Sequence, residues 1–566
     1  MRTLRDRPLS STAATRLLRS LRRATNRHPD LLALAALLGA TFAVAVFVVN
    51  FSGPPFEDAA MLMRYAENLG SGHGFVWNTG EPPVDGATDF LFMTTVAGMI
   101  RLGVPTGRAV RVLGLGSHVV TVLLVYLVNR RIWKAGVLVS LLVALYLAVG
   151  AGLWYVASYF GTTFFAMFAS LAWATGLLLM HAQSPRTLWI WTFAVCSLIA
   201  GLTRPEGALL ALFIMGAIIL VKGWRRSIPI VQIFVVVMLL GGGAYFAWHW
   251  SHFGHPLPNP YYKKGGGLLH LDSFWESMRY LIRFAGPFGL AFLLGLRRRG
   301  KRLETLAHAL PLLAFAAVFI LVSNETNFGG RFQYALWPMV LLSFFPLVRD
   351  LRQEGWSGRP AAFDRVGRAV WLVAGLAVCA ALLMYAASQA CTLTVQQRSC
   401  GIAYEADGRY EAAKMLAAYR DQGYVLATSE AGLLPLYSGW KTIDTWGLND
   451  PQIARHGEVT EEYLDKFRPH LIVFHAYFSP LVPPRNNPRD LSNAWHRMTL
   501  TLKEYAESHD YLLAAAFGDS PYEAHYYYVR TDFPESGKIA RQLSRLRNYS
   551  WYASGKKAIN YAQFGP

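Results

Sequence analysis

The sequence contains little charge and few cysteines for its length. Only 16% of its 566 residues are charged, and its four cysteines are Cys196, Cys379, Cys391 and Cys400. Their arrangement with histidine matches no zinc-binding spacing. No phosphate-binding P-loop, dinucleotide-binding glycine fingerprint or Gly-x-Ser-x-Gly nucleophile elbow occurs. The sequence therefore carries no motif of a nucleotide-binding enzyme or a serine hydrolase.

Long hydrophobic runs are abundant instead. The chain is 53% hydrophobic and 14% aromatic, and its mean hydropathy is positive. Since about 20 apolar residues cross a bilayer, we count about eleven candidate spans: 31–51, 108–126, 136–156, 162–180, 188–202, 208–221, 228–250, 278–296, 306–322, 332–348 and 369–387. A shorter run, 90–100, is a juxtamembrane or re-entrant helix or a further span. We predict a polytopic α-helical membrane protein with about 11 to 13 transmembrane helices.

The basic residues predict how the chain is oriented. Residues 1–30 form an arginine-rich tail, and the run at 31–51 is too long for a cleavable signal peptide. With this tail in the cytoplasm, the alternate loops that return to that side are mostly rich in Arg and Lys. The net charge of +19 is thus explained by the positive-inside rule, without nucleic-acid binding. We predict a multi-pass protein of the bacterial cytoplasmic (inner) membrane, with a cytoplasmic N-terminus.

The same topology brings the unusual polar segments together outside the cytoplasm. These segments are 52–107, 158–161, 202–207, 249–277 and 323–330, and the chain after residue 390 lies there too. Soluble cytosolic nucleotides are absent on that side. A transfer reaction there needs an activated substrate delivered through the membrane, such as a lipid-linked donor.

The composition divides the chain into three parts. Residues 1–30 are the basic tail, 31–390 the transmembrane module, and 391–566 an extracytoplasmic soluble α/β domain. Within the last part, short apolar runs bounded by turn residues predict buried strands at 424–429, 441–447, 471–476, 511–517 and 525–530. Cys196 and Cys379 lie in apolar spans and are expected to pack there. Cys391 and Cys400 follow the last span, where an oxidising compartment permits a disulfide.

An acidic pair, Glu57 and Asp58, lies where the chain leaves the first span. A carboxylate so placed can take the proton from an acceptor hydroxyl as it attacks. Arg64 and Tyr65 follow within two helical turns, and Arg64 can pair with the acids or hold a phosphate. The alternatives are ordinary solvation of the acids and an interfacial, snorkelling Arg64.

Four further motifs supply candidate residues. His73 and Trp77 project from a glycine-rich loop, where aromatic rings either stack on sugars or mark the membrane interface. Arg204 and Glu206 flank Pro205 between two spans, either as functional groups or as a structural pair. The loop 252–264 adds His255, Asn259 and Tyr262, with Lys263 as a cationic donor for phosphate. Arg331 lies at the outer end of a span, where a phosphate or carboxylate partner is expected.

The segment 56–92 resembles the first outer loop of the GT-C membrane glycosyltransferases, and most closely that of the mycobacterial cell-wall arabinofuranosyltransferase group. It keeps the loop's pattern at Glu57, Asp58, Arg64, Tyr65, Asn68, His73, Asn78, Gly80, Glu81, Gly86 and Thr88. The segments 202–207, 253–264 and 438–455 are similar to later motifs of this group. There are three departures: Glu57 replaces the more usual Asp, Ala87 an aromatic residue, and Gly161 a Glu.

The resemblance implies a GT-C-like fold and an inverting, metal-independent transfer from a polyprenyl-phosphate sugar. Asp58 is then the base, with Glu57 as alternative. Arg64, Arg204, Lys263 and Arg331 bind the lipid phosphate, and a second set positions the substrates: Tyr65, His73, Trp77, Glu206, His255, Asn259 and Tyr262. No cofactor, divalent metal or nucleic acid is expected.

The resemblance leaves the substrates open. The favoured donor is decaprenyl-phosphate D-arabinofuranose, used in cell-wall biogenesis, and the acceptor is an extracytoplasmic glycan, lipid or protein. One alternative is transfer of mannose or aminoarabinose to lipid A, a pilin or a polymer. Another class, a flippase of lipid-linked saccharides, is disfavoured because the sequence shows no internal repeat.

Overall fold

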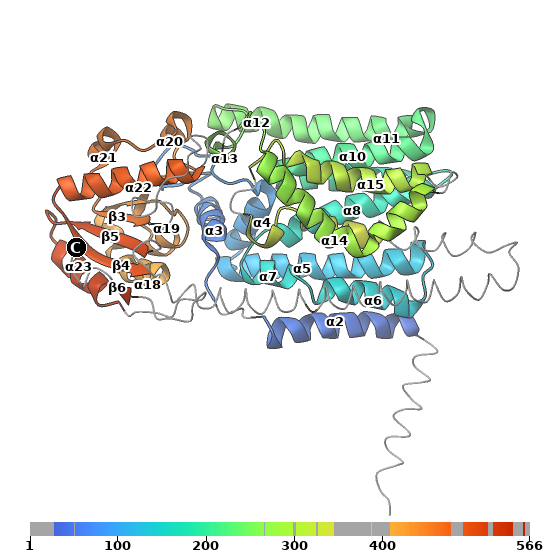
Figure 1. Ribbon diagram of the computed structural model, residues 1–566, viewed down its shortest axis with the longest axis horizontal. Helices are drawn as coiled ribbons and strands as arrows, with labels where there is room; N and C mark the ends of the chain where they lie inside the picture. Colours follow the sequence, from blue (N-terminus) through green and yellow to red (C-terminus); the bar gives the residue numbers. More distant parts are fainter. Residues whose placement is uncertain are drawn as a thin grey trace, which may run out of the picture.

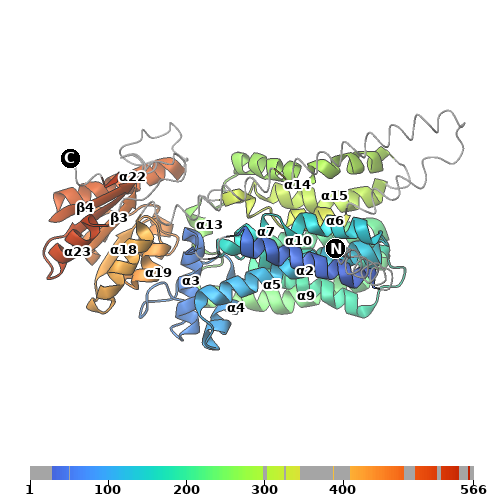
Figure 2. The same cartoon turned by 90° about the horizontal axis from the view of Figure 1, so that it is seen from below.

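The computed structural model describes residues 28–49, 51, 53–264, 266–297, 302–323, 327–343, 387, 408–476, 491–518, 524–546 and 559–560. The basic tail, most of the last predicted span, and Cys379, Cys391 and Cys400 lie outside these residues. The described chain forms a bundle of long helices with an α/β domain at one end (Figure 1). Seen from below, α3 (Glu57–Gly70) and α13 (Asn259–Lys263) lie between the two bodies (Figure 2).

The bundle consists of apolar helices that match the predicted spans. Their bounds are α2 Pro29–Phe47, α5 Thr106–Leu127, α6 Val137–Ala148, α7 Gly152–Ala157, α8 Thr162–His181, α9 Thr187–Thr203, α10 Pro205–Lys222, α11 Trp224–Val237, α12 Ala244–Phe253, α14 Leu271–Arg297 and α15 Arg302–Val318. Among the described residues, six helical stretches are long and apolar enough to cross a membrane. The predicted polytopic helical class is confirmed, while the number of spans stays a prediction.

The ambiguous apolar run at 90–100 forms the short helix α4, Phe90–Arg101. Its 12 residues extend about 18 Å, well short of the roughly 30 Å hydrocarbon core. It packs against α3, at the end of the bundle nearest the α/β domain (Figure 1). This length and place favour the juxtamembrane alternative over a further span.

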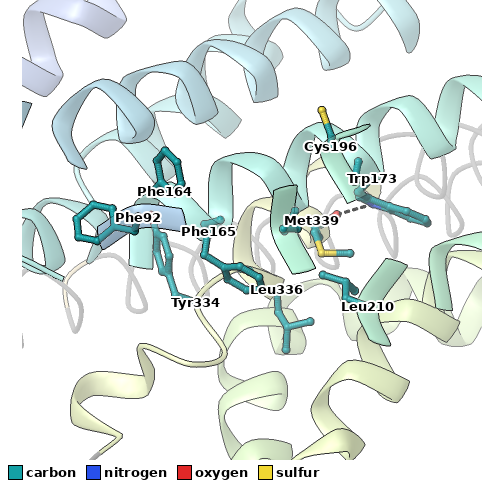
Figure 3. Close-up of a cluster of buried hydrophobic side chains, with 14 of the residues drawn as sticks. Phe92, Phe164, Phe165, Trp173, Cys196, Leu210, Tyr334, Leu336 and Met339 are labelled. Atoms are coloured by element: carbon teal, nitrogen blue, oxygen red, sulfur yellow. Dashed lines mark hydrogen bonds between the residues drawn. The ribbon is translucent and has the colours of Figure 1, made fainter. Parts of the chain in front are cut away.

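Large aromatic and aliphatic side chains fill the interior of the bundle. Trp173 is fully buried, and its indole Nε1 donates to the backbone oxygen of Met339 over 3.2 Å (Figure 3). Phe164 and Phe165 lie in the same cluster, closer to Phe92 of α4 (Figure 3). Other large apolar side chains remain exposed on the outside of the bundle, as lipid contact requires.

The C-terminal domain is a mixed six-stranded sheet in the order β2-β1-β3-β5-β4-β6. Its strands are β1 Val425–Thr428, β2 Lys441–Asp444, β3 Leu471–His475, β4 Tyr511–Gly518, β5 Ala524–Arg530 and β6 Ile559–Asn560. Its helices are α18 Arg409–Leu416, α19 Leu433–Ser438, α20 Pro451–His456, α21 Glu461–Phe467, α22 Leu491–Ser508 and α23 Ser536–Ser544.

The register of this sheet accounts for its continuous apolar strands. β1 pairs in parallel with β2 and β3, and β5 pairs antiparallel with β3 and β4. Separate hydrophobic clusters cover the two faces of the sheet. Consecutive residues such as Leu426 and Ala427, which point to opposite faces, are therefore both buried. All five predicted strands are confirmed, and so is the α/β class of the domain.

Candidate active site

An ion pair joins the first outer loop to the turn at residues 331–335, which follows the predicted outer segment 323–330. Nη2 of Arg331 donates to Oδ2 of Asp58, in the first turn of α3. The Arg331 side chain is buried over the ring of Phe160, 4.2 Å from the ring centroid. The Asp58 side chain keeps 30% exposure. Asp58 is therefore a held carboxylate that solvent or a substrate can still reach.

A second charged group lies beside this pair, at the junction of α9 and α10. Nε of Arg204 donates to Oε1 of Glu206 over 2.7 Å, and its Nη1 lies 3.4 Å from Oδ1 of Asp89. Although burial acts in the opposite direction, the negative charges of Glu206 and Asp89 raise the pKa of Arg204. Pro205 begins α10, and Arg204 before it has an extended backbone conformation.

The two arginines share an aromatic neighbour. The guanidinium of Arg204 lies 4.7 Å from the ring centroid of Phe332, and that of Arg331 lies 5.0 Å from the same centroid. Within the described chain, Nε of Arg331 is buried and has no hydrogen-bond acceptor. An unsatisfied cationic donor beside a second arginine suits a phosphate oxygen.

Glu57 points in a different direction from Asp58. Its Oε1 accepts from the backbone amides of Gly432 and Leu433 at 2.5 and 3.1 Å. Its Oε2 accepts from Nη1 of Arg409 over 3.0 Å, and the same Nη1 contacts Glu430 over 2.6 Å. The carboxylate of Glu57 thus attaches α3 to the C-terminal domain. This geometry favours Asp58 as the base, an assignment that stays a prediction.

Arg64, Tyr65 and Trp77 also connect the first outer loop to the C-terminal domain. Arg64 is buried and donates to backbone oxygens of Trp77, Pro435 and Trp440 at 2.5 to 3.0 Å, and to the side chain of Asn78. Burial lowers its pKa to about 10. These bonds occupy four of its five N–H donors, so its part in joining the two bodies is evident, while its phosphate role stays a prediction.

Tyr65 and Trp77 use their polar atoms in the same contact. The Tyr65 hydroxyl donates to Oδ1 of Asn449 over 3.0 Å, and Nε1 of Trp77 donates to the backbone oxygen of Thr442 over 3.1 Å. Both rings are almost fully buried. Their predicted part in positioning substrate is not tested, whereas their part in joining the two bodies is evident.

Lys263, in the loop 252–264, contacts the C-terminal domain. The Lys263 ammonium donates to the backbone oxygen of Gly457 and lies 4.4 Å from the ring centroid of Trp446. Burial lowers the pKa of Lys263 to about 8. Among the described residues, no contact joins Lys263 to Asp58 or Arg331. The structure therefore does not bring Lys263 into direct contact with the other predicted phosphate ligands.

The remaining predicted residues have different surroundings. The side-chain amide of Asn259 is buried, and within the described chain neither of its polar atoms has a hydrogen-bond partner. His255 contacts the backbone oxygen of Leu257 through Nδ1 over 2.6 Å and stacks edge-on with Tyr262. His73 is exposed at a turn. The roles of these four residues stay predictions.

Two groups of side chains have distances compatible with a metal ion. They are His181, Glu304 and His308 in the bundle, and Glu430, His475 and His525 in the C-terminal domain. Neither group includes Asp58, and Glu430 is paired with Arg409. The expectation that the reaction needs no metal is not tested by these groups.

Two residues of this region are not marked by the sequence. Asp89 directly precedes an apolar run, where Asp is a common helix cap. Arg409 lies on an ordinary polar helix, α18, far along the chain from Glu57. The only available signal for Asp89 is Gly161, the position of a missing acid.

Comparisons with known proteins place the fold. Residues 401–533 match a family described as a domain of unknown function, DUF8728. No curated protein matches the sequence. The structure is similar to that of ArnT from Cupriavidus metallidurans bound to undecaprenyl phosphate, with a TM-score of 0.57 and 15% identity over 90% of this chain and 99% of that chain. The apo state of ArnT gives 0.54 and 16% identity over 92% and 99%.

A further similar structure is the archaeal oligosaccharyltransferase AglB from Archaeoglobus fulgidus, with a TM-score of 0.48 and 11% identity over 90% of this chain and 75% of that chain. The likeness to ArnT shows a shared fold. It leaves the arabinofuranosyltransferase resemblance untested. The chain is thus a polytopic helical membrane protein with a C-terminal α/β domain, and its fold is similar to that of ArnT.

Proposed function

We propose that this protein is a membrane glycosyltransferase that moves a sugar from a polyprenyl-phosphate donor to an acceptor hydroxyl outside the cytoplasm. The observation that carries the proposal is the pair of Asp58 and Arg331, a reachable carboxylate bonded to a buried cation. A base and a cation within one site are what such a transfer needs. The fold shared with ArnT, whose structure contains undecaprenyl phosphate, supports the lipid part.

The reaction needs few groups. Asp58 takes the proton from the acceptor hydroxyl while the oxygen of that hydroxyl forms a bond to the anomeric carbon of the sugar. The bond between that carbon and the phosphate oxygen breaks, and the polyprenyl phosphate leaves with the electron pair. Attack opposite the leaving group inverts the anomeric centre. The leaving phosphate needs positive charge rather than a proton, and Arg331 and Arg204, which share the ring of Phe332 as a neighbour, would supply it.

The finer identity of the substrates is also proposed. The favoured donor is decaprenyl-phosphate D-arabinofuranose, on the sequence resemblance, and the acceptor is an extracytoplasmic glycan, lipid or protein. The alternatives on the same scaffold are mannose or aminoarabinose transferred to lipid A, a pilin or a polymer. The protein is placed in a bacterial inner membrane, with the site on the extracytoplasmic side, and the reaction proceeds without a metal.

The test supplies membranes containing the protein with radiolabelled polyprenyl-phosphate sugars: arabinofuranose, mannose and aminoarabinose. We expect labelled product from the wild type with one donor, and a loss of about 10²- to 10⁴-fold for Asp58→Asn. Asp532→Asn, in an exposed ion pair of the C-terminal domain, is the matched control. Full activity of Asp58→Asn would remove the assigned base. Movement of labelled lipid across the bilayer without any product would favour the flippase.

A further inference from the structure

Asp89 directly precedes α4 but does not act as its cap. An Asp at this position normally accepts a hydrogen bond from an amide in the first turn, a contact worth about 1 kcal/mol. In the described structure, the Asp89 side chain makes no such bond, although its backbone oxygen accepts from the amide of Met93. The carboxylate is directed elsewhere, at the expense of this local stabilisation.

The carboxylate is directed toward the charged groups of the candidate site. Oδ1 of Asp89 lies 3.4 Å from Nη1 of Arg204. On the other side, a Cβ atom at Gly161 would lie 2.9 Å from Oδ2 of Asp89 and equally close to the ring of Phe92. Asp89 and Phe92 together occupy the space that a side chain at position 161 would enter. The acid that the sequence resemblance places at position 161 is missing, and a carboxylate from the start of α4 lies there instead.

Asp89 is incompletely bonded in the described structure. It is 5% exposed, and in the described residues its Oδ1 has no hydrogen-bond donor. Burial raises its pKa, while the charges of Arg204 and Arg331 act in the opposite direction. A buried acceptor without a donor costs about 1–3 kcal/mol. Nε of Arg331 is the opposite case, a buried donor without an acceptor.

A sugar phosphate would satisfy both groups, because it offers phosphate oxygens as acceptors and hydroxyls as donors. We propose that Asp89 binds the sugar of the lipid-linked donor, with Oδ1 accepting a hydrogen bond from a sugar hydroxyl. The proposal rests on the proposed function and adds a substrate-binding residue to it. Gly161 is part of the same proposed sugar site, because a larger residue there would displace the Asp89 carboxylate.

The experiment measures binding rather than transfer. The purified full-length protein in detergent is titrated with undecaprenyl phosphate and, separately, with its mannosyl and arabinofuranosyl derivatives. The wild type is expected to bind a sugar-bearing lipid more tightly than bare undecaprenyl phosphate. Asp89→Ala is expected to weaken the affinity for the sugar-bearing lipid about 10- to 100-fold and to leave the affinity for the bare lipid unchanged. If Asp89 had only a structural role, its loss would weaken the binding of both lipids equally, and that result would overturn the proposal.

A relocated carboxylate gives a second, independent test. Gly161→Asp alone places two carboxylates in one space and should weaken binding of the sugar-bearing lipid. Combined with Asp89→Ala, the same substitution should recover at least part of that binding. Glu67→Gln, which removes another largely buried acid of the same loop, should bind both lipids as the wild type does.

The outcomes separate the two proposals. A wild type that distinguishes the lipids but transfers no sugar keeps the role of Asp89 and rejects the glycosyltransferase. A wild type that transfers sugar while Asp89→Ala binds normally, or while the double variant recovers nothing, rejects the role of Asp89 alone. A wild type that binds neither kind of lipid rejects both.

Discussion

Arg331 donates a hydrogen bond to Asp58 across 273 positions of sequence. The bond connects the end of the helical bundle to the first turn of α3, so it fixes where the proposed base lies. The same guanidinium packs on Phe160, a residue of a third outer segment. One side chain thus brings three of the predicted outer segments into a single site.

We expect Arg331→Met to reduce transfer at least 100-fold, because it removes both the partner of Asp58 and a cation near the leaving phosphate. Arg331→Lys should retain part of the activity, since a lysine keeps the charge but not the planar stacking on Phe160. The measurement is kcat/KM with a polyprenyl-phosphate sugar, and Arg468→Lys, an exposed arginine of the C-terminal domain, is the control. Equal activities of Arg331→Met and wild type would contradict the site.

Glu57→Gln should affect the attachment of the C-terminal domain more than the chemistry. The carboxylate accepts from two backbone amides and from Arg409, and losing its charge is expected to cost about 1.5–3 kcal/mol. The thermal midpoint in detergent and protease sensitivity between the two bodies would report this loss.

Gly432→Ala tests the same contact from the other side, because its Cβ would lie 2.1 Å from the backbone oxygen of Glu57. It should reproduce the loosened attachment with both acids still present, because the same Cβ would also lie 2.6 Å from Oε1 of Glu57 and displace that carboxylate. A Glu57→Gln protein of normal stability that has lost the chemical step would instead identify Glu57 as the base.

Arg64→Met should destabilise the protein without changing its affinity for the lipid. The substitution removes four buried hydrogen bonds, which Arg64 donates to three backbone oxygens and to the Asn78 side chain. We expect a thermal midpoint several degrees lower, with the KM for the donor within about twofold of wild type in the folded fraction. A large rise in KM at normal stability would restore the phosphate role predicted from the sequence.

Transfer should fall as the pH rises through about 8 if the charge of Lys263 contributes. Burial lowers the pKa of this lysine to about 8 from 10.5, so the free enzyme loses the charge in that range. The fall above about pH 8 should appear in the pH profile of kcat/KM. It should be absent from the profile of Lys263→Arg, because arginine stays protonated. For stability the sign is opposite: the unfolded chain holds the proton up to about 10.5, so this residue's contribution improves between pH 8 and 10.5.

Much of the site could be predicted because its residues depart from local rules. Arg204 and Glu206 are charged residues between two predicted spans, and Arg331 lies at the predicted outer end of a span, where the positive-inside rule disfavours a cation. Such positions are costly unless a partner is present, which marks them in a single sequence. The five strands of the C-terminal domain were equally evident, since short continuous apolar runs between turn residues are typical of buried strands.

What could not be predicted depends on the direction of side chains and on docking. Asp89 looks like an ordinary helix cap, and only its surroundings show that the carboxylate faces Arg204. Glu57 and Asp58 look equivalent, yet Glu57 is bonded to residues 375 and 376 positions away. No local pattern encodes such a contact, because it joins segments that are far apart in the sequence.

Glu57 is bonded to the C-terminal domain and Asp58 to Arg331 of the helical bundle, so the first turn of α3 connects the two bodies. Adjacent Cα atoms are about 3.8 Å apart, so a displacement of the C-terminal domain reaches the proposed base through one peptide unit. A ligand that shifts the C-terminal domain would therefore shift Asp58 as well, with no further element between the two.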